Sequence, residues 1–119
     1  MRVALLFGSL NVGGAEMQLI MLALALKQQR HEVIIYNSVP GQAKEREISD
    51  LGFNLRYYGQ ESGTIKRLLW LKKDLKCQKA EVLISYHGYM SFYTGLLGRW
   101  LKVNSYGGVR SDINRFLRL

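Results

Sequence analysis

Two spacings of apolar residues divide this chain into short continuous runs and longer periodic stretches. A short apolar run bounded by glycine or polar residues is typical of a buried strand, whereas apolar residues at i, i+3, i+4 and i+7 predict an amphipathic helix. The runs that predict strands are residues 2–7, 31–36, 53–58, 82–86 and 103–109. The stretches that predict helices are residues 13–26, 42–51, 64–76 and 90–101, with another helix beginning at Ser111.

Strands and helices alternate along the chain with short links between them. This alternation predicts a parallel sheet with helices on both faces, because each crossover helix packs back onto the sheet. We therefore expect an α/β fold, a Rossmann-like three-layer α/β/α arrangement with a parallel sheet of about five strands, in one domain over residues 1–119. The third strand, residues 53–58, is more polar, which favours a place nearer an edge of the sheet.

The helical spacing also predicts which side chains face the core. The first helix is apolar on nearly all sides, so we expect it to be covered almost all round. The residues on its second apolar side are Met17, Ile20, Met21 and Leu24. The inward residues expected in the helix at 64–76 are Ile65, Leu68, Leu71 and Leu75. Those expected in the helix at 90–101 are Tyr93, Leu96, Leu97, Trp100 and Leu101.

Composition places the chain among soluble globular proteins, with 48% hydrophobic and 22% charged residues. The apolar run after Arg2 is shorter than that of a secretory signal, and the longest apolar run, Leu19 to Leu26, is far short of the roughly 20 residues that cross a bilayer. The single cysteine, Cys77, cannot form an internal disulfide, so a reducing cytoplasm fits best. Cys77 is expected to be a partly buried helix residue and not a nucleophile.

Positive charge is concentrated in the second half of the chain. The formal net charge is +8. Residues 1–65 carry six Lys/Arg and six Asp/Glu, whereas residues 66–119 carry eleven Lys/Arg and three Asp/Glu. This asymmetry indicates an anionic partner, either phospholipid headgroups, a pyrophosphate-bearing acceptor or nucleic acid. The alternatives are a solvated basic surface and a face that meets an acidic partner domain.

A glycine-rich turn, Gly8–Glu16, joins the first strand to the first helix. Its adjacent glycines, Gly13 and Gly14, remove side chains where a ligand could approach the backbone closely. The helix that follows presents unpaired N–H groups and the positive end of its dipole, which together favour an anion. Glu16, in the first turn, suits that dipole and could cap the helix.

Two familiar phosphate-binding motifs are excluded at this turn. Gly8 and Gly13 have the glycine spacing of a P-loop, but Gly14-Ala15 stand where that motif has lysine and Ser/Thr. A dinucleotide-binding turn has G-x-G-x-x-G and an acid at the end of the second strand. Here that strand ends in Tyr36-Asn37, so NTP hydrolysis and NAD binding are both disfavoured.

Four segments together carry a resemblance to a known family. The most specific is Gly13-Gly14-Ala15-Glu16 after a short apolar strand, and the supporting segments are Arg30–Val33, Ala80–Gly88 and Gly107–Asp112. With these residues the chain resembles, over nearly its whole length, the N-terminal domain of the family-4 (group 1) retaining glycosyltransferases. That family has the GT-B fold.

The resemblance implies a two-domain enzyme that moves a sugar from a nucleotide-sugar donor to a saccharide or lipid-linked acceptor. The N-terminal domain of the family binds the acceptor and the C-terminal domain binds the donor, often in cell-surface polysaccharide or glycolipid synthesis. It implies that Gly13 and Gly14 lie against the donor diphosphate or the transferred sugar. Glu16 then either caps its helix or contacts a sugar hydroxyl. Neither a metal nor another cofactor is expected.

Four further residues receive roles from the same resemblance. His87 is implied beside the reacting sugar, where it could orient the acceptor, and Asn11, Arg110 and Asp112 are implied on the acceptor side. The alternative for His87 is a polar residue that ends a strand. Arg110 and Asp112 could equally pair with each other.

One departure from the family matters for function. The donor-binding domain, with its Glu-x7-Glu signature, is absent from these residues, and Leu119 falls inside an expected helix. We therefore expect a truncated form or one part of a split enzyme that transfers no sugar alone. The expected location is the cytoplasm, either free or peripheral at the inner face of the membrane.

Three other classes of protein remain open on sequence. One is a membrane-associating or acceptor-binding subunit of a split glycosyltransferase, with Leu69 and Trp70 as insertion candidates. The basic residues beside them are Lys66, Arg67, Lys72 and Lys73. Another is a different Rossmann-like enzyme, such as a sugar epimerase, because fold alone does not fix function. Nucleic-acid binding is disfavoured, since no zinc, helix-turn-helix or RNA-recognition motif is present.

Overall fold

A parallel sheet forms the centre of the computed structural model, which describes residues 1–7, 14–38, 41, 45–59, 63–85 and 88–106. Within this part of the chain the strands are β1 (Arg2–Leu6), β2 (Glu32–Asn37), β3 (Asn54–Tyr57), β4 (Val82–Ser85) and β5 (Asn104–Tyr106). Their order across the sheet is β3-β2-β1-β4-β5, and every pairing is parallel. In the centre, Leu5 of β1 lies opposite Ile35 on one side and Ile84 on the other.

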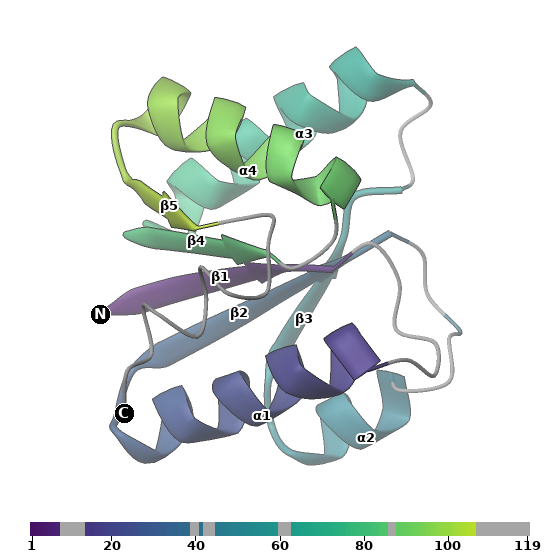
Figure 1. The fold of residues 1–119 in the computed structure, drawn as a ribbon, viewed down its shortest axis with the longest axis vertical. Helices are drawn as coiled ribbons and strands as arrows, with labels where there is room; N and C mark the ends of the chain where they lie inside the picture. Colours follow the sequence, from purple (N-terminus) through teal and green to yellow (C-terminus); the bar gives the residue numbers. More distant parts are fainter. Residues whose placement is uncertain (8–13, 39–40, 42–44, 60–62, 86–87, 107–119) are drawn as a thin grey trace.

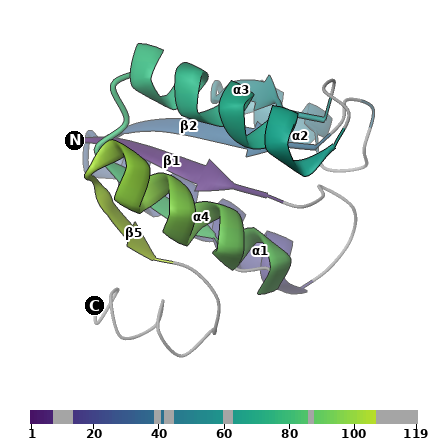
Figure 2. The same cartoon turned by 90° about the horizontal axis from the view of Figure 1, so that it is seen from above.

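Helices cover both faces of this sheet (Figure 1). The helices α1 (Gly14–Gln28) and α2 (Glu45–Asp50) lie on one face, and α3 (Thr64–Cys77) and α4 (Gly88–Leu101) lie on the other. In the view from above, α3 and α4 lie in front of the sheet, and the fainter α1 and α2 lie behind it (Figure 2). The expected fold class, a Rossmann-like α/β/α arrangement with five parallel strands, is therefore confirmed.

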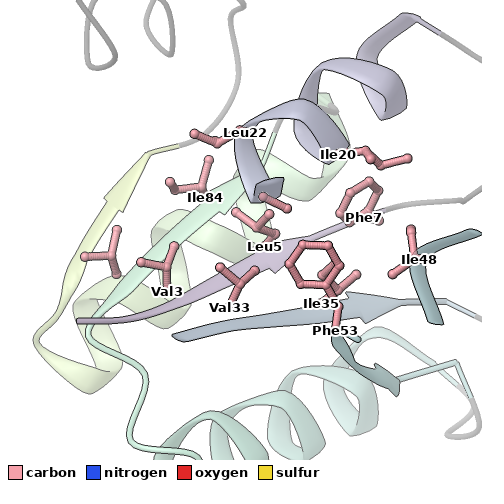
Figure 3. Close-up of a cluster of buried hydrophobic side chains, with 12 residues drawn as sticks. Val3, Leu5, Phe7, Ile20, Leu22, Val33, Ile35, Ile48, Phe53 and Ile84 are labelled. Atoms are coloured by element: carbon pink, nitrogen blue, oxygen red, sulfur yellow. The ribbon is translucent and has the colours of Figure 1, made fainter. Parts of the chain in front are cut away.

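Two hydrophobic cores result from the alternation of side chains along the strands. In β1, Val3 and Leu5, followed by Phe7, face α1 and α2, where Ile48 of α2 joins the cluster (Figure 3). Ala4 and Leu6 face the opposite way, into a second cluster under α3 and α4. The residues that these two helices contribute to it are Leu68, Leu71, Leu75, Tyr93 and Leu97. Burial on both faces explains why the central strands are continuous apolar runs.

The third strand lies at an edge of the sheet, as its polar sequence predicts. β3 pairs only with β2 among the described strands, and its residues are exposed or half-buried. The observed elements otherwise begin and end within a few residues of the expected ranges. Tyr86, residues 42–44, Gly107–Val109 of the expected fifth strand and the helix expected from Ser111 lie outside the described residues.

Three helices end in the same way, at the end of the sheet where the strands begin. Within two residues of each helix end, one residue has a left-handed backbone: Arg30 (φ 68°), Lys79 (φ 57°) and Lys102 (φ 57°). The next amide then reaches back to a carbonyl five residues earlier, in the pattern of a Schellman motif. These bonds are His31 N to Leu26 O at 3.0 Å, Ala80 N to Leu75 O at 3.1 Å and Val103 N to Gly98 O at 3.0 Å. Each motif turns the chain directly into the next strand.

Several burial expectations are wrong, and they share a physical reason. Met17 and Met21 of α1, Ile65 of α3, and Leu96 and Trp100 of α4 are all exposed. These helices form outer layers and bury only the side that faces the sheet, so a second apolar stripe is left at the surface.

Two residues of α3 also differ from expectation. Cys77 is exposed and not partly buried, and it is the last residue of α3. Trp70 is half-buried against the second core and meets the Tyr36 ring edge-on, with 6.3 Å between ring centroids. It is therefore part of the fold's packing and not an exposed anchor.

Candidate functional site

The order of the strands defines one special position on the sheet. After β1 the chain passes to α1 on one face, and after β4, the neighbour of β1, it passes to α4 on the other face. In open α/β sheets, ligands bind outside the carboxyl ends of the strands at the point where the connections diverge in this way. The candidate site is therefore the carboxyl edge between β1 and β4.

The sequence-predicted site residues all follow the ends of β1, β4 and β5. Asn11, Gly13, His87, Arg110 and Asp112 lie outside the described residues. Their roles stay predictions.

Two further candidates belong to α1. Gly14 is its first residue, and Glu16 lies in its first turn, although the Glu16 side chain is outside the described part. The start of α1 therefore lies on the carboxyl side of the sheet, in the connection that follows β1. This is the position that the sequence predicts for the glycine turn.

A buried tyrosine fastens the end of β1. The Tyr58 hydroxyl donates a hydrogen bond of 2.7 Å to the carbonyl of Phe7, which is the last described residue before the glycine-rich turn. Tyr58 follows β3, so this bond joins the edge strand to the central strand across β2. The Phe7 amide donates to the Tyr36 carbonyl at 2.8 Å, and the Tyr58 amide donates to the Asn37 carbonyl at 3.0 Å. These bonds fix the position at which the chain leaves the sheet.

A second buried contact fastens the end of β4. The Thr94 hydroxyl of α4 lies 2.8 Å from the Ser85 hydroxyl, and both side chains are fully buried. Tyr93, next to Thr94, packs against the Tyr58 ring with 6.5 Å between centroids. Neighbouring residues of α4 thus contact both supports, with Thr94 bonded to Ser85 at the end of β4 and Tyr93 packed on Tyr58.

This edge is suited to an anionic group for a reason that does not depend on side chains. α1 and α4 begin here, at Gly14 and Gly88, and a helix start presents backbone N–H donors and a partial positive charge. Diphosphates and carboxylates are the ligands that such an arrangement favours.

The start of α2 already has a carboxylate of the chain itself, because Glu45 is the first residue of this helix. Glu45 accepts hydrogen bonds from the Tyr57 hydroxyl and from the Gly41 amide. Burial, followed by the hydrogen bond and the charge of Glu45, raises the pKa of Tyr57 to about 12. Tyr57 therefore stays a neutral donor to Glu45 at physiological pH.

Two hollows in the described surface lie at the opposite edge of the sheet, beside the amino ends of the strands. One, of about 410 Å³, is lined by residues that include Arg2, Lys27 and His31, and its neighbour, of about 430 Å³, is lined by residues that include Arg30 and Lys79. Polar groups in this region connect the starts of the strands. Arg2 binds Glu32 at 2.8 Å and donates to the Gln78 carbonyl at 2.6 Å. We do not take these hollows as the ligand site, because ligands of parallel sheets bind outside the carboxyl ends of the strands, at the other edge.

Within the described residues, no three His, Cys, Asp or Glu side chains come close enough to hold a metal ion. None of the described helices combines the length and the apolar composition needed to span a bilayer.

The strand order, together with the diverging connections after β1 and β4, defines the class of fold. The chain is a doubly wound α/β domain of the Rossmann-like kind found in GT-B proteins.

Solved structures with a similar fold include a glycosyltransferase and an epimerase. The chain is similar to MurG from Acinetobacter baumannii, with a TM-score of 0.72 and 16% identity over 90% of this chain and 34% of that one. It is also similar to UDP-GlcNAc 2-epimerase from Methanocaldococcus jannaschii, with a TM-score of 0.64 and 19% identity over 98% of this chain and 36% of that one. No family model and no curated protein matches the sequence. The chain spans about a third of either structure, and the likeness shows the fold.

Sequence reasoning missed the residues that support the candidate edge, namely Tyr58, Ser85 and Thr94. Each acts through a contact with a residue distant in sequence or on another element, which periodicity does not reveal. One signal was present for Tyr58. A tyrosine that ends an edge strand, between Tyr57 and Gly59, needs a partner for its hydroxyl once the ring is buried.

Proposed function

We propose that this chain is the acceptor-side domain of a GT-B glycosyltransferase of the family-4 type. It would work with a donor-binding domain to move a sugar from a nucleotide sugar to a saccharide or lipid-linked acceptor, in cell-surface polysaccharide or glycolipid synthesis. The observation that carries the proposal is the turn that ends in Gly13-Gly14-Ala15-Glu16. It connects β1 to α1 at the carboxyl edge, where the connections of the sheet diverge.

The chemistry proposed at this edge is electrostatic. Sugar transfer develops negative charge on the departing diphosphate, and backbone N–H groups at the start of α1 would stabilise that charge without a metal. Gly13 and Gly14 would permit the close approach that such backbone contacts need. Tyr58 would keep the end of β1, and hence the start of the turn, in a fixed position through its bond to Phe7.

The remaining site roles belong to the same proposal. His87 would bond a sugar hydroxyl or orient the acceptor, since it directly follows β4 and precedes α4. Asn11, Arg110 and Asp112 would contribute to the acceptor side, where the Arg110 guanidinium suits a phosphate or a carboxylate.

A direct test separates the proposal from its nearest alternative. The purified chain, incubated with a panel of labelled nucleotide sugars and with saccharide and lipid-phosphate acceptors, is expected to give no transfer. The reading frame that encodes the chain should be sequenced beyond the Leu119 codon, and any domain with a Glu-x7-Glu signature should be produced together with the chain. Sugar transfer by this combined protein would support the proposal.

Two results would contradict it. Transfer by the chain alone would show that no second domain is needed. Conversion of UDP-GlcNAc to its 2-epimer without transfer to an acceptor would instead favour an epimerase. The similarity to UDP-GlcNAc 2-epimerase is the observation that keeps this second class open.

A further inference from the structure

The carboxyl edge of the sheet contains buried polar side chains that the rest of the described core lacks. Among the described residues, three Asn, Ser or Thr side chains are fully buried: Asn37, Ser85 and Thr94. Asn37 is the last residue of β2, Ser85 is the last residue of β4, and Thr94 bonds Ser85. A buried polar group lowers stability unless it is hydrogen-bonded, so three of them at one edge call for an explanation.

Asn37 differs from the other two because it interrupts the apolar side of its strand. Val33 and Ile35 of β2 belong to the core under α1 and α2. Side chains two residues apart point to the same face of a strand, so the Asn37 carboxamide lies on that face as well. Packing alone would favour another aliphatic side chain at this position.

The position of Asn37 relates it to the end of β1 and to the start of α1. The register pairs Leu6 with Tyr36, so the next residues of the two segments, Phe7 and Asn37, follow side by side. The helix α1 packs on β2 and begins at this end of the sheet, at Gly14 (Figure 1). Asn37 therefore lies on the face that α1 covers, at the end where α1 begins.

The backbone of Asn37 is fixed on both sides. Its carbonyl accepts a hydrogen bond of 3.0 Å from the Tyr58 amide, and the Tyr58 hydroxyl bonds the Phe7 carbonyl at 2.7 Å. Asn37 also lies opposite Tyr57 in the pairing of β2 with β3. A side chain that is fully buried on a fixed backbone has a defined position, which a residue must have if it is to orient a neighbouring segment.

A carboxamide has the chemistry to hold the start of a helix. It offers two N–H donors and one oxygen acceptor, and the first N–H groups of a helix have no partner within that helix. The Asn37 side chain has an interaction of its own, and its buried Oδ1 atom accepts no hydrogen bond from the described residues. This oxygen is suited to accept a backbone N–H.

The neutral charge of Asn37 fits a site for an anion. At the start of α2 the corresponding support is charged, because the Glu45 carboxylate accepts the Gly41 amide. A carboxylate beside the start of α1 would repel a diphosphate, whereas a carboxamide supplies the same kind of acceptor without the charge.

We propose that Asn37 is a positioning residue of the candidate site, whose carboxamide holds the start of α1 so that the backbone N–H groups there face a diphosphate. Asn37 does not itself contact the ligand, since its side chain is fully buried. The inference rests on the proposed function, which assigns the diphosphate to the start of α1.

The variant Asn37→Leu separates positioning from core packing. Leucine has a similar size and suits the apolar cluster of Val33 and Ile35, so the urea midpoint of the variant should be unchanged or higher. Amides in the first turn of α1, from Gly14, should exchange hydrogen with solvent about tenfold faster, because they lose a hydrogen-bonding support. A residue that served only the core would give a lower midpoint and unchanged exchange in this turn.

Ligand affinity provides a second measurement. Nitrogen-labelled chain is titrated with inorganic pyrophosphate, and the dissociation constant is taken from the amide shifts. Asn37→Leu is expected to raise this constant about tenfold, because a displaced helix start directs its N–H groups away from the ligand.

Two control variants show whether the effect belongs to this position. Asn54→Leu makes the same chemical change at the exposed first residue of β3, at the amino edge, and should alter neither the dissociation constant nor exchange in α1. Thr94→Val removes a buried polar group from the α4 side of the carboxyl edge and should leave exchange at the start of α1 unchanged. Circular dichroism of each variant establishes that the fold is intact.

Three results would overturn the proposal. They are unchanged exchange at the start of α1 in Asn37→Leu, equal acceleration there in Thr94→Val, and an unchanged dissociation constant in Asn37→Leu when the unmodified chain binds pyrophosphate. Failure of the proposed function gives a different result. The unmodified chain then binds no pyrophosphate, whereas exchange at the start of α1 still decides whether Asn37 holds this helix.

Discussion

Asp74 holds together three parts of the chain that are distant in sequence. Arg56 of β3 donates to both of its carboxylate oxygens, at 2.6 and 2.7 Å, and the Tyr36 hydroxyl of β2 donates at 2.6 Å. Asp74 itself belongs to α3, so this cluster joins the edge of the sheet to the helical layer above it. A two-pronged bond between a guanidinium and a carboxylate fixes both distance and orientation.

Asp74→Asn is expected to lower the free energy of unfolding by about 2 kcal/mol, because Arg56 loses its charged partner and one of its acceptors. Arg56 is partly exposed, and solvent therefore limits the loss. Asp50→Asn, on an exposed position of α2, should change stability by less than about 0.5 kcal/mol. Urea denaturation of the two variants checks this difference, and equal effects would show that the cluster does not stabilise the fold.

Tyr36 makes the stability of the fold sensitive to alkaline pH. Burial, followed by the hydrogen bond to Asp74 and its negative charge, raises the pKa of Tyr36 well above its ordinary value of 10.0. Above pH 10 the folded chain therefore keeps a proton that the unfolded chain releases, so the free energy of unfolding falls as pH rises. The contribution of this group is complete below pH 10 and is lost progressively above it, by up to about 1.4 kcal/mol per pH unit.

The variant Tyr36→Phe lacks this titration. Urea midpoints measured for it across the alkaline range should fall less steeply than those of the unmodified chain. Parallel pH profiles for the two proteins would contradict the assignment.

At the scale of elements, α4 contains two glycines with different surroundings. A Cβ added at Gly98 would lie 2.6 Å from the Ser105 hydroxyl oxygen and 2.7 Å from the Ser105 Cβ of β5. A Cβ added at Gly95 would meet nothing within 4 Å. Gly98 therefore allows α4 to lie close against the edge strand, whereas Gly95 lies on an exposed side of the helix with room for a methyl group.

Alanine substitutions at these two positions should act in opposite directions. Gly95→Ala is expected to raise the free energy of unfolding by about 0.5–1 kcal/mol through better helix propensity. Gly98→Ala should lower it by about 1–3 kcal/mol, because β5 must move to relieve the overlap. Thermal and urea unfolding of both variants provide the comparison, and stabilisation by Gly98→Ala would contradict the close packing of α4 against β5.

The elements themselves could be predicted from sequence because spacing and burial agree in the strands. Val3, Leu5 and Phe7 face one core and Ala4 and Leu6 the other, so a continuous apolar run fits a strand buried on both faces. In the helices the same reasoning was incomplete. Spacing reveals two apolar stripes on α4 but does not reveal which one faces the sheet, and for this reason Leu96 and Trp100 were assigned to the core.

The supports of the candidate edge could not be predicted because they depend on tertiary geometry. The bond from Tyr58 to Phe7 joins residues 51 positions apart, and the contact of Thr94 with Ser85 exists only because α4 packs against β4. The edge itself could be predicted, since parallel strands connected by right-handed crossovers bring all their carboxyl ends together. The predicted order of strands and helices therefore indicates where the candidate site lies. The choice of its residues depends on the resemblance to a known family.

At the scale of the whole molecule, the two edges of the sheet have different roles. At the amino edge, Arg30, Lys79 and Lys102 end three helices in left-handed conformations, and Arg2 connects the starts of the strands through Glu32. At the carboxyl edge, α1 and α4 begin beside the diverging connections of β1 and β4. The contacts that stabilise the starts of the strands and the proposed ligand site thus lie at opposite ends of the strands.

The most direct test of this account maps where a diphosphate binds. Backbone amide spectra of nitrogen-labelled chain should be recorded during titration with inorganic pyrophosphate and, separately, with UDP. We expect the largest shifts at the carboxyl edge, in the amides that follow Phe7 and Ser85 and in the first turns of α1 and α4, from Gly14 and Gly88. Shifts confined to Arg2, His31 and Gln78 at the opposite edge, or none at millimolar ligand, would contradict the assignment of the ligand site.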